Sequence, residues 1–156
     1  GWQVVLAGSN AAAEMTLCRH ISDALDGACL NYCGRTGLRE LAALVSVCSL
    51  TLAPDSAVMH LSSALKVPVI GLHAIHDPRR VGAWHYPQLT VSVYEECLSA
   101  ERGPGPHPWR CRVHDPQAMS KLETAAVLKV FTGVCEALEN GCPPPPLHRQ
   151  LNPEHA

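Results

Sequence analysis

The sequence has no long apolar run, no block of basic residues and no internal repeat. None of its apolar stretches reaches the roughly 18–20 residues that a membrane-spanning helix needs. Residues 1–3, GWQ, also lack the charged start of a signal peptide. The net charge of −2 is spread over mixed signs, which gives little support to a nucleic-acid surface or a polybasic membrane patch. We therefore predict a globular domain with no transmembrane segment and no nucleic-acid partner.

The sequence also lacks the glycine-rich fingerprint of a dinucleotide site and the tight Cys-x-x-Cys spacing of a zinc site. No Gly-x-Gly-x-x-Gly follows the first expected strand, so a standard dinucleotide site is not predicted. The eight cysteines lie in a chain with ample core, which favours reduced thiols over a small disulfide scaffold. A zinc site remains an alternative, although its ligands would match no tight Cys-x-x-Cys spacing. The residues that could supply it are His73, His76, Cys97, His107, Cys111 and His114.

With 156 residues, 47% of them apolar, the chain can bury one core. We expect one domain over residues 1–141 and a disordered, proline-rich tail over residues 142–156. Because the chain starts almost directly on an apolar strand, it reads as a piece of a longer protein.

Apolar segments of strand length alternate with segments of helical periodicity. Strands are expected at residues 3–7, 28–32, 49–53, 69–72 and, at a sheet edge, 89–93. Helices are expected at residues 11–26, 38–48, 56–67 and 121–139. The first helix has an inner stripe of Leu17, Cys18, Ile21 and Leu25. Residues 73–82 and 95–117 are expected to be loops, and Ser120 with Glu123 resembles a capping box. This alternation predicts an α/β fold, a Rossmann-like parallel sheet flanked by helices.

The segment from residue 55 to residue 72 organises the rest. Asp55 or Ser56 can cap the helix that follows, and Val58, Leu61 and Leu65 fall on its expected inner face. In a parallel sheet this helix would start at the carboxyl edge, where α/β folds bind ligands. Its free N–H groups and its dipole favour an anion such as phosphate.

Three blocks in this order resemble glycosyltransferase family 9, the ADP-heptose:lipopolysaccharide heptosyltransferases. They are residues 34–44, GRTGLRELAAL, residues 55–65, DSAVMHLSSAL, and residues 68–82, which begin PVI and end DPRRVG. The resemblance implies the C-terminal, donor-binding half of a GT-B enzyme with two Rossmann-like domains. An N-terminal domain that binds the acceptor and carries the base would be missing, so the chain alone should be inactive.

The resemblance also implies an inverting transfer that needs no metal or other cofactor. Ser56 and the N–H groups of Ala57 and Val58 would hold the donor diphosphate, with His60 reaching phosphate or sugar. Thr36 would lie near the nucleotide base, and Arg35 would replace a lysine. The implied donor-binding set is Gly34, Arg35, Thr36, Asp55, Ser56, Ala57, Val58 and His60.

Simpler interpretations stay open for several of these residues. Asp55 and Ser56 suit a plain helix cap, His60 a core or surface histidine, and Arg35 a solvated loop charge. The turn at residues 77–80, DPRR, either leaves its arginines in solvent or flanks the cleft.

Two positions depart from the family pattern. Ala57 stands where the family has glycine. The family's acid for the donor ribose falls near residues 11–12, where Glu14 is the nearest carboxylate.

The predicted function is transfer of heptose from ADP-heptose to a lipopolysaccharide core acceptor. The acceptor, a lipid-linked saccharide, would be bound by the missing domain. The setting would be cytoplasmic, with peripheral association at the inner membrane. Two alternatives remain: a catalytically silent nucleotide-binding or interaction domain, and a GT-B enzyme that uses another nucleotide sugar.

Overall fold

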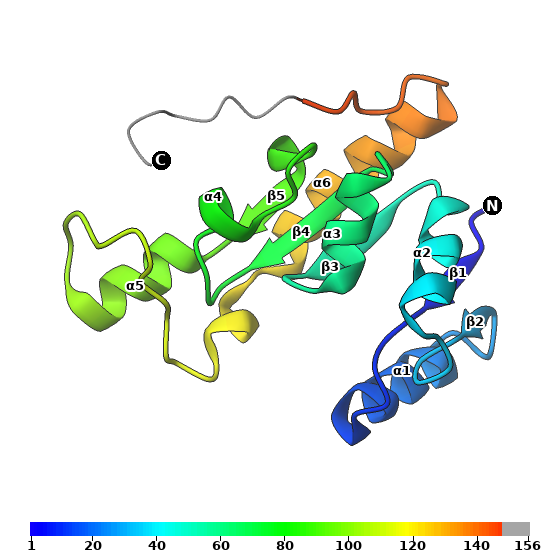
Figure 1. Cartoon of the computed structure of the whole chain (residues 1–156), viewed down its shortest axis with the longest axis horizontal. Coiled ribbons are helices and arrows are strands. Elements are labelled where there is room, and N and C mark those ends of the chain that lie inside the picture. The colour runs from blue at the N-terminus through cyan, green and yellow to red at the C-terminus, as the bar shows by residue number, and fades with distance from the viewer. Residues whose placement is uncertain (148–156) are drawn as a thin grey trace. The chain divides into compact units, whose positions relative to one another are not determined.

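The computed structural model describes residues 1–147, which form two compact units (Figure 1). The first unit is Gly1–Leu44 and the second begins at Val45. Each unit is described here on its own. Of the predicted tail, residues 148–156 lie outside the described residues.

The first unit is built on one pair of parallel strands. Its elements are β1 (Val4–Leu6), α1 (Ala12–Ala24), β2 (Cys29–Asn31) and most of α2 (Leu38–Ser46). In the strand register, Val4 lies opposite Cys29. The predicted inner stripe of α1 is wrong except at Cys18, because Leu17, Ile21 and Leu25 are exposed. Two three-residue strands offer α1 too little surface to cover a whole helical face.

The second unit contains a three-stranded parallel sheet in the order β3-β4-β5. The strands are β3 (Thr51–Pro54), β4 (Val69–His73) and β5 (Thr90–Ser92), so the predicted edge strand is confirmed. The helices are α3 (Ala57–Ala64), α4 (Pro78–Val81), α5 (Tyr94–Arg102) and α6 (Thr124–Glu139), with short 3-10 turns η1 (Pro87–Leu89) and η2 (Ala118–Lys121). Helix α3 contacts β3 and β4, and α6 contacts β5. Parallel strands joined through helices confirm the predicted α/β class.

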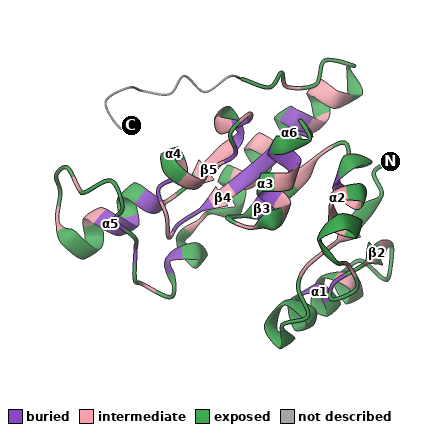
Figure 2. Ribbon diagram, in the orientation of Figure 1, coloured by how far each residue is buried: buried purple, intermediate pink, exposed green. Residues whose placement is uncertain are grey.

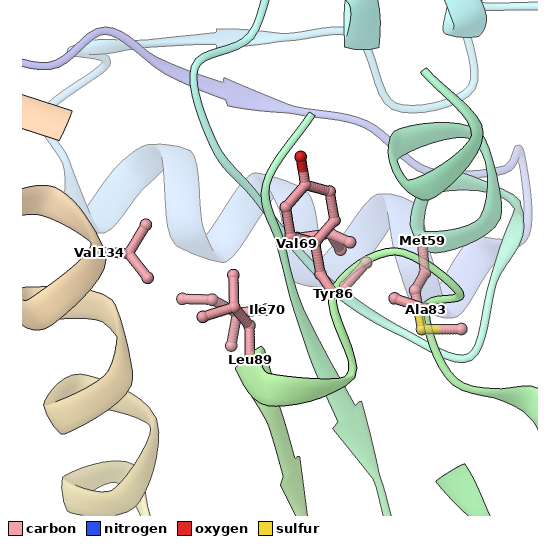
Figure 3. Close-up of a cluster of buried hydrophobic side chains, with 8 residues drawn as sticks. Met59, Val69, Ile70, Ala83, Tyr86, Leu89 and Val134 are labelled. Atoms are coloured by element: carbon pink, nitrogen blue, oxygen red, sulfur yellow. The ribbon is translucent and has the colours of Figure 1, made fainter. Parts of the chain in front are cut away.

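The second unit has two buried apolar clusters, one along β4 and one that includes Tyr94, Cys97 and Leu98 of α5, and Figure 2 shows buried residues at both elements. Val69 and Ile70 are completely buried, because β4 is paired on both edges and covered on both faces. Figure 3 shows Val134 reaching from α6 toward Ile70 and Leu89. The same cluster includes Met59, which brings α3 onto the sheet.

The buried face of α3 differs from the predicted one. Met59, Ser62 and Ser63 are buried, whereas Leu65 is exposed and Val58 is half-buried. The two serines tolerate burial because their hydroxyl groups have partners. Ser62 Oγ donates to the Val58 carbonyl at 2.7 Å, and Ser63 Oγ accepts the His85 N–H at 2.9 Å. Apolar periodicity misses a helical face whose inner residues are satisfied hydroxyls.

Three local predictions outside α3 are wrong. The predicted loop over residues 95–117 contains most of α5, whose Tyr94, Cys97 and Leu98 are buried at helical spacing. The polar loop over residues 73–82 contains the short helix α4, capped by Asp77. There is no capping box at α6, since its N-cap is Glu123 and Ser120 Oγ donates instead to the Gln117 carbonyl at 2.6 Å.

The segment that follows α6 returns to the second unit. The Leu147 N–H donates to the His85 carbonyl at 2.7 Å, and Gln88 Nε2 donates to the Pro145 carbonyl at 3.1 Å. These two bonds tie residues 145–147 to the chain around η1. Within residues 1–147, no helix is long and apolar enough to cross a membrane.

Candidate functional site

The first candidate site is the turn between β3 and α3. Ser56 is the N-cap, with an extended backbone at φ −156° and ψ 170°, yet no side chain caps the helix. The predicted N-cap position at Ser56 is confirmed, whereas the predicted side-chain hydrogen bond from Asp55 or Ser56 is absent. Asp55 and Ala57 are exposed and Ser56 is half-buried, so side chains do not plug the turn.

Two histidines lie next to the Asp55 carboxylate. His60 Nε2 lies 3.2 Å from Asp55 Oδ1, and His76 Nδ1 lies 3.3 Å from Asp55 Oδ2. A carboxylate accepts hydrogen bonds, so His60 donates to Asp55 through Nε2, whereas His76 lies within ion-pair distance of it. The sequence pointed to His60 by its block, but His76, in a segment predicted as a polar loop, carried no signal for this contact.

The backbone N–H groups at the start of α3 are left open. The first bond of the helix runs from the His60 N–H to the Ser56 carbonyl at 3.3 Å. Among the described residues, the N–H groups of Ala57 and Val58 have no acceptor. Unpaired N–H groups at the positive end of a helix dipole favour a bound anion.

His73 lies at the end of β4, near the two histidines that hold Asp55. Its side chain is 2% exposed, and neither ring nitrogen has a hydrogen-bond partner among the described residues. Burial lowers the pKa of His73, despite opposing effects from Asp55 and Asp77. Gly71 makes room for the ring, because an added Cβ there would lie 3.1 Å from His73 Nε2.

The zinc alternative finds no support in the described part of the chain. No group of three or more histidine, cysteine, aspartate or glutamate side chains within residues 1–147 is placed to hold a metal ion. All eight cysteines are free thiols.

The arginines of α4 have different roles. Asp77 accepts the Arg79 N–H at 2.8 Å and is paired with the Arg79 guanidinium, which also reaches Glu95 Oε1 at 2.7 Å. Burial by itself raises the pKa of Asp77, but the hydrogen bonds from Arg79 outweigh it and hold the pKa below its ordinary value. Arg79 thus stabilises the local fold. Arg80 is exposed and has no ion pair within residues 1–147.

A groove of about 380 Å³ lies between α3 and the segment around α4. It is lined by His60, Ser63, Ala64, Arg80, Val81, Gly82, Trp84 and His85. The groove connects His60 and Arg80, which lie in the second and third family blocks, to Trp84 and His85, which no motif indicated.

The second candidate site belongs to the first unit, at the carboxyl ends of β1 and β2. Gly34 has a φ of +71°, which favours glycine, and its N–H donates to the Gly8 carbonyl at 2.9 Å. The Ser9 N–H donates to Glu14 Oε2 at 2.7 Å. Glu14 is the carboxylate nearest to residues 11–12, where the family's acid for the donor ribose is expected, and this bond holds it at the loop after β1.

Arg35 and Thr36 follow in the same turn. Arg35 lines a pocket of about 190 Å³, and Thr36 is half-buried. The pocket is lined by Met15, Arg19, Ser22, Asp23, Asn31, Cys33 and Arg35. The eight predicted site residues therefore fall into two groups, one in each unit.

Comparison with known proteins decides the family. Residues 1–104 match the model of glycosyltransferase family 9 (heptosyltransferase). The chain belongs to this family. The match covers more of the chain than residues 28–82, where the three blocks and their flanks resemble the family, and it includes the first unit and the second unit as far as residue 104.

Curated and solved relatives agree with this membership. The chain is 32% identical over 127 residues to the lipopolysaccharide core heptosyltransferase OpsX of Haemophilus influenzae. That match includes 80% of this chain and 37% of OpsX, so the chain spans well under half of that family member.

Two solved structures share the fold. The E. coli ADP-heptose LPS heptosyltransferase II matches 89% of this chain and 38% of its own, with a TM-score of 0.61 and 22% identity. A family 9 glycosyltransferase from Veillonella parvula matches 83% of this chain and 38% of its own, with a TM-score of 0.50 and 20% identity. Both likenesses agree with the predicted GT-B half.

Proposed function

We propose that this chain is the donor-binding part of a glycosyltransferase and that the first turn of α3 holds the donor diphosphate. The observation that carries the proposal is the uncapped helix start, where Ala57 and Val58 present unpaired N–H groups. The Ser56 hydroxyl adds a third donor, and His60 lies one turn further along the helix. Together they form an exposed anion site made mostly of backbone.

In the proposed reaction the acceptor hydroxyl oxygen attacks the anomeric carbon of the donor sugar with inversion. The bond from that carbon to the diphosphate breaks, and its electron pair leaves with the diphosphate. Charge develops on the leaving oxygen, so fixed N–H donors aimed there lower the barrier. We place the base that takes the acceptor proton in a further domain, and the reaction needs no metal if the α3 turn stabilises the leaving group.

Thr36, Gly34 and Arg35 are proposed for the base and its surroundings, and Glu14 for the ribose. The position of the Glu14 carboxylate supports the role proposed for it, because the Ser9 N–H holds that carboxylate at the carboxyl end of β1.

We further propose ADP-heptose as the donor and a lipopolysaccharide core saccharide as the acceptor. The names of two relatives support this assignment, one a lipopolysaccharide core heptosyltransferase and the other an ADP-heptose LPS heptosyltransferase. Such a reaction would take place in the cytoplasm, with the enzyme at the surface of the inner membrane. The lipid-linked acceptor would be bound mainly by the further domain.

A proline at position 57 tests the anion site directly. Proline removes the Ala57 N–H and is well tolerated at the first position of a helix. Ser56 already has the extended backbone that a following proline requires. In calorimetric titrations, Ala57→Pro should weaken ADP binding about tenfold or more, which corresponds to losing one hydrogen bond to a charged group.

The matched control is Ala57→Gly, which keeps the N–H and restores the residue of the family pattern. It should bind ADP at least as tightly as the native chain. Equal ADP affinity in the proline and glycine variants would exclude the α3 turn as the diphosphate site.

Titrations of the native chain with ADP, UDP and GDP separate the alternatives. Preference for ADP supports the proposed donor, and preference for another nucleotide supports a different nucleotide sugar. Absence of binding in the millimolar range would indicate a catalytically silent domain. We expect no sugar transfer by the 156-residue chain alone.

A further inference from the structure

The groove beside α3 carries an inference about a second ligand group. Its first wall is one face of α3, where His60, Ser63 and Ala64 recur at the spacing of neighbouring helical turns. Its second wall runs from Arg80 to His85. A volume of about 380 Å³ falls in the usual range for small-molecule sites.

Hydrogen bonds hold the second wall against α3. The His85 N–H donates to Ser63 Oγ at 2.9 Å, and His85 Nδ1 contacts the Ser63 carbonyl at 2.7 Å. The Tyr86 hydroxyl donates to the Lys66 carbonyl at 2.6 Å. Ala83 and Tyr86 are each 1% exposed. The wall is therefore preformed, so a ligand need not order it.

Trp84 is the outward residue of this fixed segment. It is 42% exposed, although Ala83 before it is buried. Its indole N–H has no hydrogen-bond partner among the described residues. The groove is therefore lined by an exposed aromatic ring, whose π-face can attract polarised C–H groups, together with a free donor.

The charge of the groove is positive. Arg80 is the one arginine that lines the groove, no lysine lines it, and Arg80 has no ion pair within residues 1–147. No aspartate or glutamate lines the groove. The carboxylates nearby are already engaged, Asp77 with Arg79 and Asp55 with His60 and His76. An anionic ligand group would give Arg80 the partner that the described chain does not provide.

We propose that this groove binds a sugar ring that carries a phosphate or a carboxylate. The anion contacts the Arg80 guanidinium, and the ring stacks on the Trp84 indole. The inference rests on the proposed function in one respect. The charge of a donor such as ADP-heptose lies on its diphosphate, so an acidic sugar in this groove belongs to the receiving saccharide.

The test is a titration of the full 156-residue chain with glucose 6-phosphate, glucuronate, methyl glucoside and inorganic phosphate. Binding is followed through the indole N–H resonance of Trp84, which is assigned by its loss in Trp84→Phe. The acidic sugars should shift this resonance at lower concentration than either methyl glucoside or inorganic phosphate. Tighter binding of one acidic sugar identifies its anion as the preferred group.

Variants separate the two contacts. Arg80→Gln should weaken glucose 6-phosphate about tenfold and leave methyl glucoside unchanged, and Arg80→Lys should recover part of the loss. Trp84→Ala, followed by calorimetry, should weaken both sugars. Arg110→Gln is the control, because Arg110 is exposed and does not line the groove.

Three results would overturn the proposal. They are no binding of either acidic sugar, unchanged glucose 6-phosphate affinity in Arg80→Gln, and an equal loss of ADP affinity in that variant, which would make Arg80 a donor contact. A wrong proposed function would give a different pattern of binding results from a wrong groove proposal. In that case ADP does not bind the native chain, while glucose 6-phosphate still binds in an Arg80-dependent way.

Discussion

The turns that form the two candidate sites differ in what their backbone N–H groups do. In the first unit, the N–H groups of Ser9, Cys33 and Gly34 all donate to acceptors in the same unit. In the second unit, Ala57 and Val58 have no acceptor for theirs among the described residues. The first turn is closed by its own hydrogen bonds, whereas the second is open to a ligand. A diphosphate site needs a turn with unpaired N–H groups, because an N–H group that already donates to an acceptor in the protein cannot also donate to a phosphate.

The two units also differ in how their turns are supported. Only Cys18 and Cys33 are buried among the residues of the first unit, while the second unit contains both buried apolar clusters. We infer that local geometry stabilises the closed turn and that core packing holds the open turn in place.

Two methionines give the strongest test of this difference. Met59 on α3 is completely buried, whereas Met15 on α1 is 40% exposed. Met59→Ala should lower the free energy of unfolding by about 2 to 5 kcal/mol because it leaves a cavity. Met15→Ala should lower it by less than about 1 kcal/mol. Urea unfolding measures both, and equal losses would contradict the contrast in core packing.

A smaller effect is expected at the buried carboxylate of the second unit. Asp77→Asn removes the ion pair with Arg79 and should lower the free energy of unfolding by about 1 to 2 kcal/mol at pH 7, the exposure of Arg79 limiting the loss. Because Arg79 holds the pKa of Asp77 below 3.8, the native advantage is complete above pH 3.8. It is then lost as the pH falls through the lower pKa of the folded state.

Urea titrations of both proteins at a series of pH values check this prediction. The exposed Asp23→Asn is the control and should follow the native curve. A constant difference between Asp77→Asn and the native chain down to the most acidic pH would contradict the assigned ion pair.

Gly34 tests the closed turn of the first unit, and Gly133 in α6 of the second unit gives a comparison with the opposite sign. Gly34 has a φ of +71°, so Gly34→Ala should lower the free energy of unfolding by about 1 to 2 kcal/mol. Gly133 lies inside α6 with nothing near its missing Cβ, and Gly133→Ala should raise that free energy by about 0.5 to 1 kcal/mol. Thermal unfolding reports both changes, and a neutral Gly34→Ala would show that the turn does not depend on its backbone geometry.

Much of the fold was predictable because the apolar pattern follows burial where the sheet is well covered. The parallel strands, the edge position of β5 and the end of α6 at Glu139 agree with the sequence. The pattern failed where polar groups are satisfied internally or where cover is thin. Ser62 and Ser63 conceal the inner face of α3, and Leu17 has helical spacing yet remains exposed. Residues 95–117 were predicted as a loop because of the glycines and prolines that follow α5, although Tyr94 and Leu98 have helical spacing.

The start of α3, where we propose the site, was predictable from the sequence, but the bonding around it was not. The blocks placed a ligand site at the start of α3, and the helix does begin there without a cap. The partner of Asp55 could not be inferred, because His76 follows β4 and reaches it only through strand pairing. Trp84 gave no signal, and the DPRR turn of Arg80 left open whether its arginines lie in solvent or flank the cleft. The two residues become informative together only when a groove brings them side by side.

The bond from Leu147 to His85 has a practical consequence for anyone who shortens this protein. His85 lines the groove, and its carbonyl accepts a hydrogen bond from Leu147, in the segment after α6. An expression boundary drawn at Gly141 would look harmless on a map of helices and strands. It would nevertheless remove the contacts that residues 145–147 make with His85 and Gln88, so binding by such a truncation should be compared with binding by the intact chain.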